Sequence, residues 1–217
     1  MGHSILVDHL RKYQGKVVAG LHVGANSGQE RQLWRKVGAH RVLWVEANPE
    51  MMPELRENIL RFKGHTAHCA MLGNQNKENV PFHIFGHGGA SSMLDKVDGE
   101  SAWGLKKQRT ILRPMIRAEV LIGDLGIKPG TLNTAVIDVQ GAELKVLKGF
   151  GKYLPHMQYV VVEYIVPETY KGADAMTEVV LFMLSKGFHL WTAKPRKPET
   201  GDLLFVRGVP VKRNKRN

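Results

Sequence analysis

The feature that most constrains the fold is an alternation of strand-like and helix-like segments along most of the chain. Apolar or β-branched stretches stand at Val17–Val23, Arg41–Val45, Thr134–Val139 and Gln158–Ile165. Segments with helical spacing of apolar residues follow them, at Gln29–Val37, Pro49–Phe62, Ala142–Tyr153 and Ala173–Lys186. This alternation predicts an α/β fold with a mostly parallel sheet and helices on both of its faces.

Other segments extend or interrupt this pattern. Thr66–Leu72 has a weak strand pattern, and Phe188–Thr192 with Leu203–Val206 predicts a final pair of strands. Asn79–Phe85 predicts one additional strand. Residues 86–117 show little periodicity, and a segment of this length in a compact domain is usually functional. We therefore predict a substrate loop or lid at 86–117, with Ser91, Ser92 and Trp103 contacting the substrate.

The first strand runs into a glycine turn, Gly24-Ala25-Asn26-Ser27-Gly28. In open α/β sheets, ligands bind beside the carboxyl ends of the strands. Gly24 and Gly28 permit a tight turn and a close approach of the backbone, and Asn26 adopts the left-handed conformation more readily than most residues. The turn therefore predicts a wall of a ligand site.

Glu46, at the end of the second expected strand, indicates which ligand this is. An acid about 20 residues beyond a glycine turn suits a ribose diol, because a carboxylate accepts hydrogen bonds from two hydroxyls. The chain has neither the G-x-G-x-x-G turn of dinucleotide sites nor a G-x-x-x-x-G-K-[ST] phosphate loop. A ribose site without a pyrophosphate cradle favours an adenosyl compound that lacks phosphates.

Several motifs together resemble those of the FkbM-type methyltransferases. The turn within 22–30 resembles the first motif of that family, Glu46-Ala47-Asn48-Pro49 the end of its second strand, and 89–93 its small-residue loop. The run 137–143, Ile-Asp-Val-Gln-Gly-Ala-Glu, resembles its most distinctive motif, usually I-D-V-E-G-A-E. Val162-Glu163 matches the acid that ends the fifth strand, and the resemblance covers roughly residues 18–191.

The resemblance implies a class I methyltransferase fold, a Rossmann-like sheet of order 3-2-1-4-5-7-6 whose last strand is antiparallel. It implies S-adenosylmethionine as the cofactor and O-methylation of a hydroxyl on a sugar, glycan or natural product. His22 stands where the family usually has Asp, and Gln140 where it usually has Glu. The expected cofactor-binding residues are His22, Gly24, Ala25, Asn26, Gly28, Glu46, Ala47, Asn48, Ala70 and Asp138.

Three carboxylates beside the expected cofactor site are the candidate catalytic residues. Asp138, at the end of the fourth strand, is the candidate general base or acceptor-positioning group; the alternative is a structural cap of the next helix. Glu143 could instead be an acid at the start of a helix, where the helix dipole favours negative charge. Glu163 could instead be a carboxylate in a structural ion pair. Jointly they form an oxygen-rich set that suits Mg²⁺ or Ca²⁺, although we expect no metal.

Charge and composition leave further alternatives for the partner. The chain has 217 residues and a formal net charge of +11, which attracts anions such as nucleic acid, acidic glycans or a membrane surface. Methylation of RNA or other nucleic-acid ribose, or a non-catalytic adenosyl- or anion-binding module, are therefore alternatives to a small-molecule enzyme. No apolar run approaches the about 18 residues that span a bilayer, and the one cysteine, Cys69, suits a cytoplasmic location. We expect one domain over 1–217 with a basic tail at 209–217.

Overall fold

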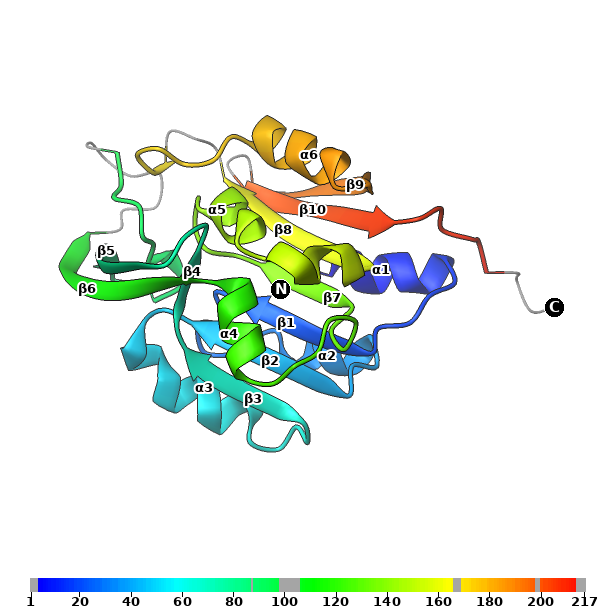
Figure 1. Ribbon diagram of the computed structural model, residues 1–217, viewed down its shortest axis with the longest axis horizontal. Coiled ribbons are helices and arrows are strands. Elements are labelled where there is room, and N and C mark those ends of the chain that lie inside the picture. Colours follow the sequence, from blue (N-terminus) through cyan, green and yellow to red (C-terminus); the bar gives the residue numbers. More distant parts are fainter. Residues whose placement is uncertain (1–3, 87, 98–105, 166–168, 198–199, 214–217) are drawn as a thin grey trace.

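The centre of the fold is a seven-stranded sheet with the strand order β3-β2-β1-β7-β8-β10-β9 (Figure 1). The computed structural model describes residues 4–86, 88–97, 106–165, 169–197 and 200–213. Parallel pairing joins β3, β2, β1, β7 and β8, and β10 is antiparallel to both of its neighbours. This confirms the expected order 3-2-1-4-5-7-6. The strands are β1 Ala19–Val23, β2 Arg41–Glu46, β3 His65–Cys69, β7 Thr134–Ile137, β8 Tyr159–Ile165, β9 Phe188–Lys197 and β10 Thr200–Arg207.

Helices cover both faces of this sheet, as the alternation predicts. On one face α1, α2 and α3 pack in a single apolar cluster with side chains such as Val42, Trp44 and Val161. On the other face α4, α5 and α6 pack with Leu21, Val45 and their neighbours. β8 is apolar at almost every position because both of its faces are buried. The helices are α1 Ile5–Lys12, α2 Arg31–Lys36, α3 Met52–Ile59, α4 Ala118–Asp124, α5 Glu143–Lys148 and α6 Met176–Ser185.

A second, three-stranded sheet of order β4-β6-β5 lies beside the carboxyl end of β3 (Figure 1). Its strands are β4 Met71–Gly73, β5 Lys77–Phe85 and β6 Lys107–Arg117. β6 falls in the segment 86–117, for which we predict a loop or lid, so the last third of that segment is regular structure paired with β5. Trp103 lies outside the described residues.

Short helical elements account for further differences from the sequence prediction. Neither α1 nor α4 was expected, and the predicted helices at 49–62 and 142–153 each divide into an α-helix and a 3₁₀ turn. The turns are η1 Pro49–Met51, η2 Gly88–Ala90 and η3 Gly151–His156. Among the helices in the described ranges, none is long and apolar enough to cross a membrane.

Candidate functional site

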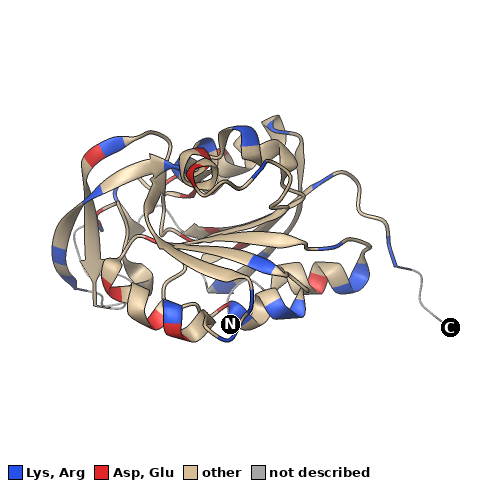
Figure 2. Cartoon of the chain, turned by 60° about the horizontal axis from the view of Figure 1, so that its bottom comes forward, with Lys and Arg blue, Asp and Glu red and all other residues tan. Residues whose placement is uncertain are grey.

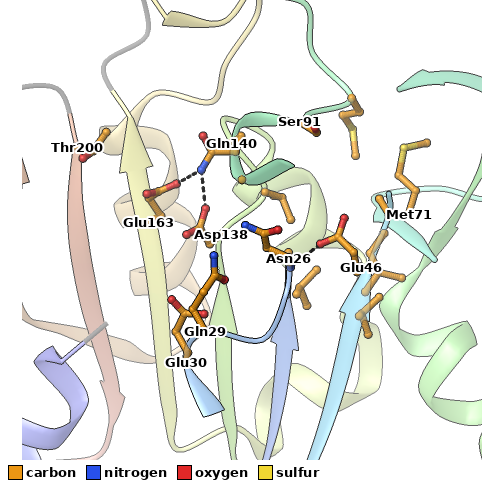
Figure 3. Close-up of a pocket in the computed structure, with 18 of the residues that line it drawn as sticks. Asn26, Gln29, Glu30, Glu46, Met71, Ser91, Asp138, Gln140, Glu163 and Thr200 are labelled. Atoms are coloured by element: carbon orange, nitrogen blue, oxygen red, sulfur yellow. Dashed lines mark hydrogen bonds between the residues drawn. The ribbon is translucent and has the colours of Figure 1, made fainter. Parts of the chain in front are cut away.

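A cavity of about 680 Å³ opens at the carboxyl ends of β1, β2, β7 and β8 (Figure 3). Its volume lies within the roughly 300–1,000 Å³ typical of small-molecule sites. The glycine turn and Glu46 form one side, and Asp138, Gln140 and Glu163 form another. The loop around Ser91 and the β9–β10 hairpin complete the wall. The site is therefore where open α/β sheets place their ligands.

The glycine turn has the left-handed backbone that its sequence predicts. Gly24, Asn26 and Gly28 have φ angles of 79°, 46° and 76°. The N–H groups of Gly24 and Ala25 both donate to the carbonyl of Val45, at 2.9 and 3.0 Å, which ties the turn to β2. A Cβ at Gly24 would collide with the carbonyl oxygen of Asp138. Glycine thus lets the turns that follow β1 and β7 touch each other.

Glu46 is held as a fixed acceptor at the edge of the cavity. Its Oε2 accepts from the backbone N–H of Asn26 at 2.7 Å, and its Oε1 from that of Asn48 at 2.6 Å. Burial raises the pKa of Glu46, and the N–H bonds from Asn48, Asn26 and Ala47 oppose that rise. A carboxylate offers about four acceptor positions, so these three N–H bonds still leave acceptor capacity on a side chain whose orientation is already set.

Beyond Glu46 the cavity has an apolar end. Met71, Phe82 and Met93 line it and belong to one cluster, which Ala47 joins. Figure 3 shows Met71 beside Glu46, on the side away from Asp138. A flat aromatic ligand group is the natural occupant of such a wall, because thioether sulfur makes favourable contacts with aromatic rings.

Asn26 contributes a polar atom with no partner in the described part of the chain. Its Oδ1 is buried and accepts no hydrogen bond there, while Asn26 itself lines the cavity. A buried acceptor left unpaired costs about 1–3 kcal/mol. The site thus offers acceptors to a ligand that donates hydrogen bonds.

Opposite Glu46, one amide joins two carboxylates. Nε2 of Gln140 donates to Oδ1 of Asp138 at 2.6 Å and to Oε2 of Glu163 at 2.5 Å (Figure 3). Gln140 has a φ of 58°, and its carbonyl accepts from Oγ of Ser92 at 2.8 Å. The Tyr170 hydroxyl donates to its Oε1 at 3.2 Å. Both polar atoms of the Gln140 side chain therefore have partners. In the sequence, Gln140 stood out only as a departure from the family motif.

Glu163 also forms an ion pair, as its structural alternative predicts. Arg196 on β9 binds Oε1 of Glu163, and the same guanidinium lies 3.5 Å from Oδ1 of Asp202. Burial raises the pKa of Glu163. The negative charge of Asp138 and a hydrogen bond between the two side chains raise this pKa further, whereas the positive charge of Arg196 lowers it. Asp138, Glu163 and Arg196 all line the cavity and form its charged end.

Glu143 lies beneath the turn that follows β7 and is not among the residues lining the cavity. Its Oε1 accepts from the N–H of Val139 at 3.0 Å, and its Oε2 from that of Gly141 at 3.1 Å. Burial raises the pKa of Glu143 to about 8. In the described ranges no group of three or more His, Cys, Asp or Glu side chains is arranged to hold a metal, so the Mg²⁺ or Ca²⁺ alternative has no ligand set there.

His22 faces the interior on the α2 side of the sheet, not the cavity. Its side chain is 1% exposed, accepts from Nε1 of Trp34 at 3.1 Å and stacks on Trp44 with ring centres 4.8 Å apart. Successive residues of a strand point to opposite faces, and Gly20, two residues earlier, leaves the room that the Trp34 ring occupies. The resemblance placed His22 at the cofactor; the structure places it in the aromatic core.

The other predicted residues divide between the cavity wall and its support. Ala47, Ala70 and Ser91 line the cavity. Ser92 is buried and ties the 88–93 loop to the Gln140 turn. Ala25, Gly28 and Asn48 support the wall: Ala25 is fully buried, Gly28 packs toward Leu55, and Asn48 holds Glu46 through its N–H.

Several lining residues are not among the predicted site residues. Two of them, Gln29 and Glu30, belong to the run 22–30 that resembles the first family motif; the others are Lys194, Arg196 and Thr200. Lys194 and Arg196 lie on β9, which the sequence predicted to end at Thr192. The hairpin brings Arg196 across the sheet to Glu163, whereas Lys194 binds Asp8. For Lys194 and Arg196, the only signal was a charged side chain just beyond the expected strand end at Thr192.

Comparison with known proteins gives one family. The model of the methyltransferase FkbM domain matches residues 22–190. No curated protein matches the sequence.

Solved structures share the fold at low sequence identity. A methyltransferase FkbM from Methylobacillus flagellatus KT superposes with a TM-score of 0.56 and 13% identity, over 88% of this chain and 43% of that one. A precorrin-6y C5,15-methyltransferase from Geobacter metallireducens GS-15 gives 0.51 and 12%, over 94% and 85%. Aeropyrum pernix fibrillarin, in complex with natively bound S-adenosyl-L-methionine, gives 0.51 and 12%, over 88% and 67%. At these identities the similarity concerns the fold.

Proposed function

The chain belongs to the FkbM methyltransferase family, and from this premise we propose that it methylates a hydroxyl of a sugar, glycan or natural product with S-adenosylmethionine. One observation carries the proposal: a single cavity has a fixed ribose-type acceptor, Glu46, beside an apolar wall and a carboxylate pair at its other end. The first part suits the cofactor, and the second suits an acceptor that must lose a proton.

The residues present fit this cofactor. Its ribose hydroxyls and amino group are hydrogen-bond donors, and the cavity offers Glu46, the Oδ1 of Asn26 and Asp138 as acceptors. Its adenine suits the wall of Met71 and Phe82. When bound, it supplies a methyl group already activated by attachment to a sulfonium sulfur. The chain therefore has to bind, align and handle a proton rather than activate the donor.

Asp138 is the residue we assign to the acceptor proton. Nε2 of Gln140 donates to Oδ1 of Asp138 at 2.6 Å, and this bond holds the Asp138 carboxylate in one orientation in the cavity. Glu163, with Arg196 bound on its far side, gives Asp138 a buried carboxyl neighbour whose pKa is raised. A proton leaving an acceptor hydroxyl thus enters a paired carboxyl system rather than water. We further propose that Ser91, at the rim, contacts the acceptor.

The charge around the cavity favours an acceptor without phosphates over nucleic acid. Three cations of β6 already have partners: Lys107 pairs with Asp95 at 2.7 Å, Arg117 with Glu119 at 2.6 Å, and Arg109 with Glu50. Arg196, inside the cavity, pairs with Glu163 and Asp202. A phosphate backbone would have to displace these carboxylates.

The test is transfer of a labelled methyl group by the purified protein to a panel of acceptors. The panel contains neutral sugars and glycans, hydroxylated natural products, RNA and DNA, and Asp138→Asn serves as the control. We expect label on a hydroxyl of a small molecule or glycan. Label on RNA ribose would show that the acceptor is RNA and not a small molecule or glycan. Cofactor binding without transfer to any member of the panel would indicate a binding module instead.

A further inference from the structure

The amino ends of the parallel strands lie at the edge of the sheet opposite the cavity. Because β1, β2, β3 and β7 are parallel, the segments that precede them meet at one edge, where β10 also ends. Backbone and side-chain bonds join these segments: His40 N–H donates to Val18 O at 3.1 Å, and Asn133 Nδ2 to Lys16 O at 2.8 Å. Gln14 N–H donates to Val211 O at 2.7 Å. We call this edge, with the segments 12–18, 35–41, 60–64, 124–133, 185–189 and 207–213, the basic pole.

The basic pole carries cations and almost no acids. Every one of its segments contains lysine or arginine, and Asp124 is the one carboxylate residue within them. None of its lysines or arginines forms a salt bridge with another residue that the structure describes. In Figure 2, blue segments recur near the end of the molecule where the C-terminus lies. Exposed examples are Lys16, Lys36, Arg41, Lys63, Lys128 and Lys212.

Exposed aliphatic side chains stand among these cations. Leu60 is 81% exposed, Val209 83%, Val211 59% and Val18 46%. Strands lie about 4.8 Å apart, so the pole extends for roughly 24 Å from β3 to β10. Single exposed apolar residues need no explanation, but their recurrence within one unneutralised basic edge does.

We propose that the basic pole docks the protein on an anionic lipid bilayer. Interfacial membrane binding combines electrostatic attraction to anionic headgroups with burial of apolar side chains, and the pole offers both. Single-stranded nucleic acid is instead bound by basic grooves with aromatic stacking platforms, and the exposed apolar residues of the pole are aliphatic. The cavity lies at the opposite ends of the strands, so a docked molecule keeps its mouth toward the water. This inference does not depend on the acceptor proposed above.

The test is sedimentation of the full chain with vesicles of phosphatidylcholine alone or mixed with phosphatidylglycerol. We expect binding to the anionic vesicles that weakens as salt increases. Arg41→Glu/Lys63→Glu should lower the partition coefficient at least about 25-fold, since each basic residue near an anionic surface contributes about fivefold. The matched control Lys77→Glu/Lys106→Glu changes net charge equally on the β5–β6 hairpin and should bind like the wild type.

A second pair of variants separates the apolar contribution. Leu60→Ser/Val209→Ser should lower partitioning at least about tenfold, whereas Leu112→Ser/Leu181→Ser, exposed elsewhere, should not. All four variants should keep the wild-type cofactor affinity, which excludes misfolding as the cause of any loss. Absent vesicle binding, equal binding to neutral vesicles, or equal loss in the hairpin control would overturn the proposal. If the wild type bound RNA but no vesicles, and the pole variants abolished the RNA binding, the basic pole would be a nucleic-acid surface instead of a membrane surface.

Discussion

The amide nitrogen of Gln140 lies 2.6 Å from Oδ1 of Asp138, and this bond determines how the carboxylate faces the cavity. The same nitrogen bonds Glu163, so both amide protons are used on carboxylates. Ser92 donates to the carbonyl oxygen of Gln140, and Tyr170 donates to its Oε1. The charged end of the cavity is thus organised by an uncharged side chain.

Asp138→Asn should keep cofactor binding and lose turnover by at least about a hundredfold, because a general base contributes about 10²–10⁴. The amide preserves the shape but accepts no proton. Calorimetry with the cofactor and initial rates with the acceptor measure the two effects. Wild-type turnover in this variant would show that another group takes the proton.

Gln140→Glu should move the pH dependence of turnover to higher pH by about one unit or more. A third carboxyl between Asp138 and Glu163 is a like charge within contact distance, and like charges raise carboxyl pKa values. Gln140→Met adds no charge but removes the amide hydrogen bonds to both carboxylates, so it should lower the rate with a smaller shift in the same direction. A pH profile that stays in place in Gln140→Glu would mean that Gln140 does not act on the proton-accepting pair.

Glu46→Ala should weaken cofactor binding tenfold or more, since a hydrogen bond to a charged group is worth roughly 1.5–3 kcal/mol. Glu50→Ala removes an exposed acid a few residues along the chain and should leave affinity unchanged. Titration calorimetry with the cofactor measures both. Equal affinity in Glu46→Ala and the wild type would refute the ribose assignment.

Glu143 should make folding stability depend on pH. Its pKa in the folded state is about 8, against an ordinary value of 4.5, so between these values the folded state retains a proton that the unfolded state has lost. The free energy of unfolding should therefore fall as the pH rises from about 5 to 8, by up to about 1.4 kcal/mol per unit. Glu143→Gln cannot titrate and should show a shallower slope in urea unfolding, whereas Glu54→Gln, on the exposed side of α3, should not. The pKa values of Glu46 and Glu163 are also raised, so some slope of the same sign remains.

His22→Leu should destabilise the fold by about 1–3 kcal/mol, because it leaves the buried Nε1–H of Trp34 without its acceptor. Cofactor affinity should not change, since the His22 side chain does not line the cavity. His40→Leu, at an exposed position, serves as the control in urea unfolding. If His22→Leu lost cofactor affinity while its free energy of unfolding stayed that of the wild type, His22 would have to contact the cofactor after all.

Glu46 and His22 were both predicted to bind the cofactor, but only Glu46 lines the cavity, and the difference shows what the sequence could predict. Glu46 ends a strand whose apolar pattern is clear, and its distance from the glycine turn has a chemical reason, so its place in the cavity could be predicted. His22 is the last but one residue of β1, where alternation sends neighbouring side chains to opposite faces. Its direction depends on Trp34 and Trp44, which approach from other elements.

Long-range pairing explains the other differences. Arg196 reaches Glu163 only because β9 continues past Thr192 and folds back through β10. Strand β6 could not be foreseen because its polar and apolar residues do not alternate in the usual way, and its partner β5 decides its conformation. The order of the main sheet was predictable because it follows from the family resemblance and the regular alternation.

The contact between Gly24 and the carbonyl of Asp138 has a consequence for engineering this molecule. No larger residue fits between the two turns, so a mutational library that alters either one disturbs both halves of the cavity together. The β9–β10 hairpin and the loop around Ser91 border the same cavity without that constraint. Variants with new acceptor preferences should therefore accumulate on those two segments, while the turns after β1 and β7 stay invariant under selection.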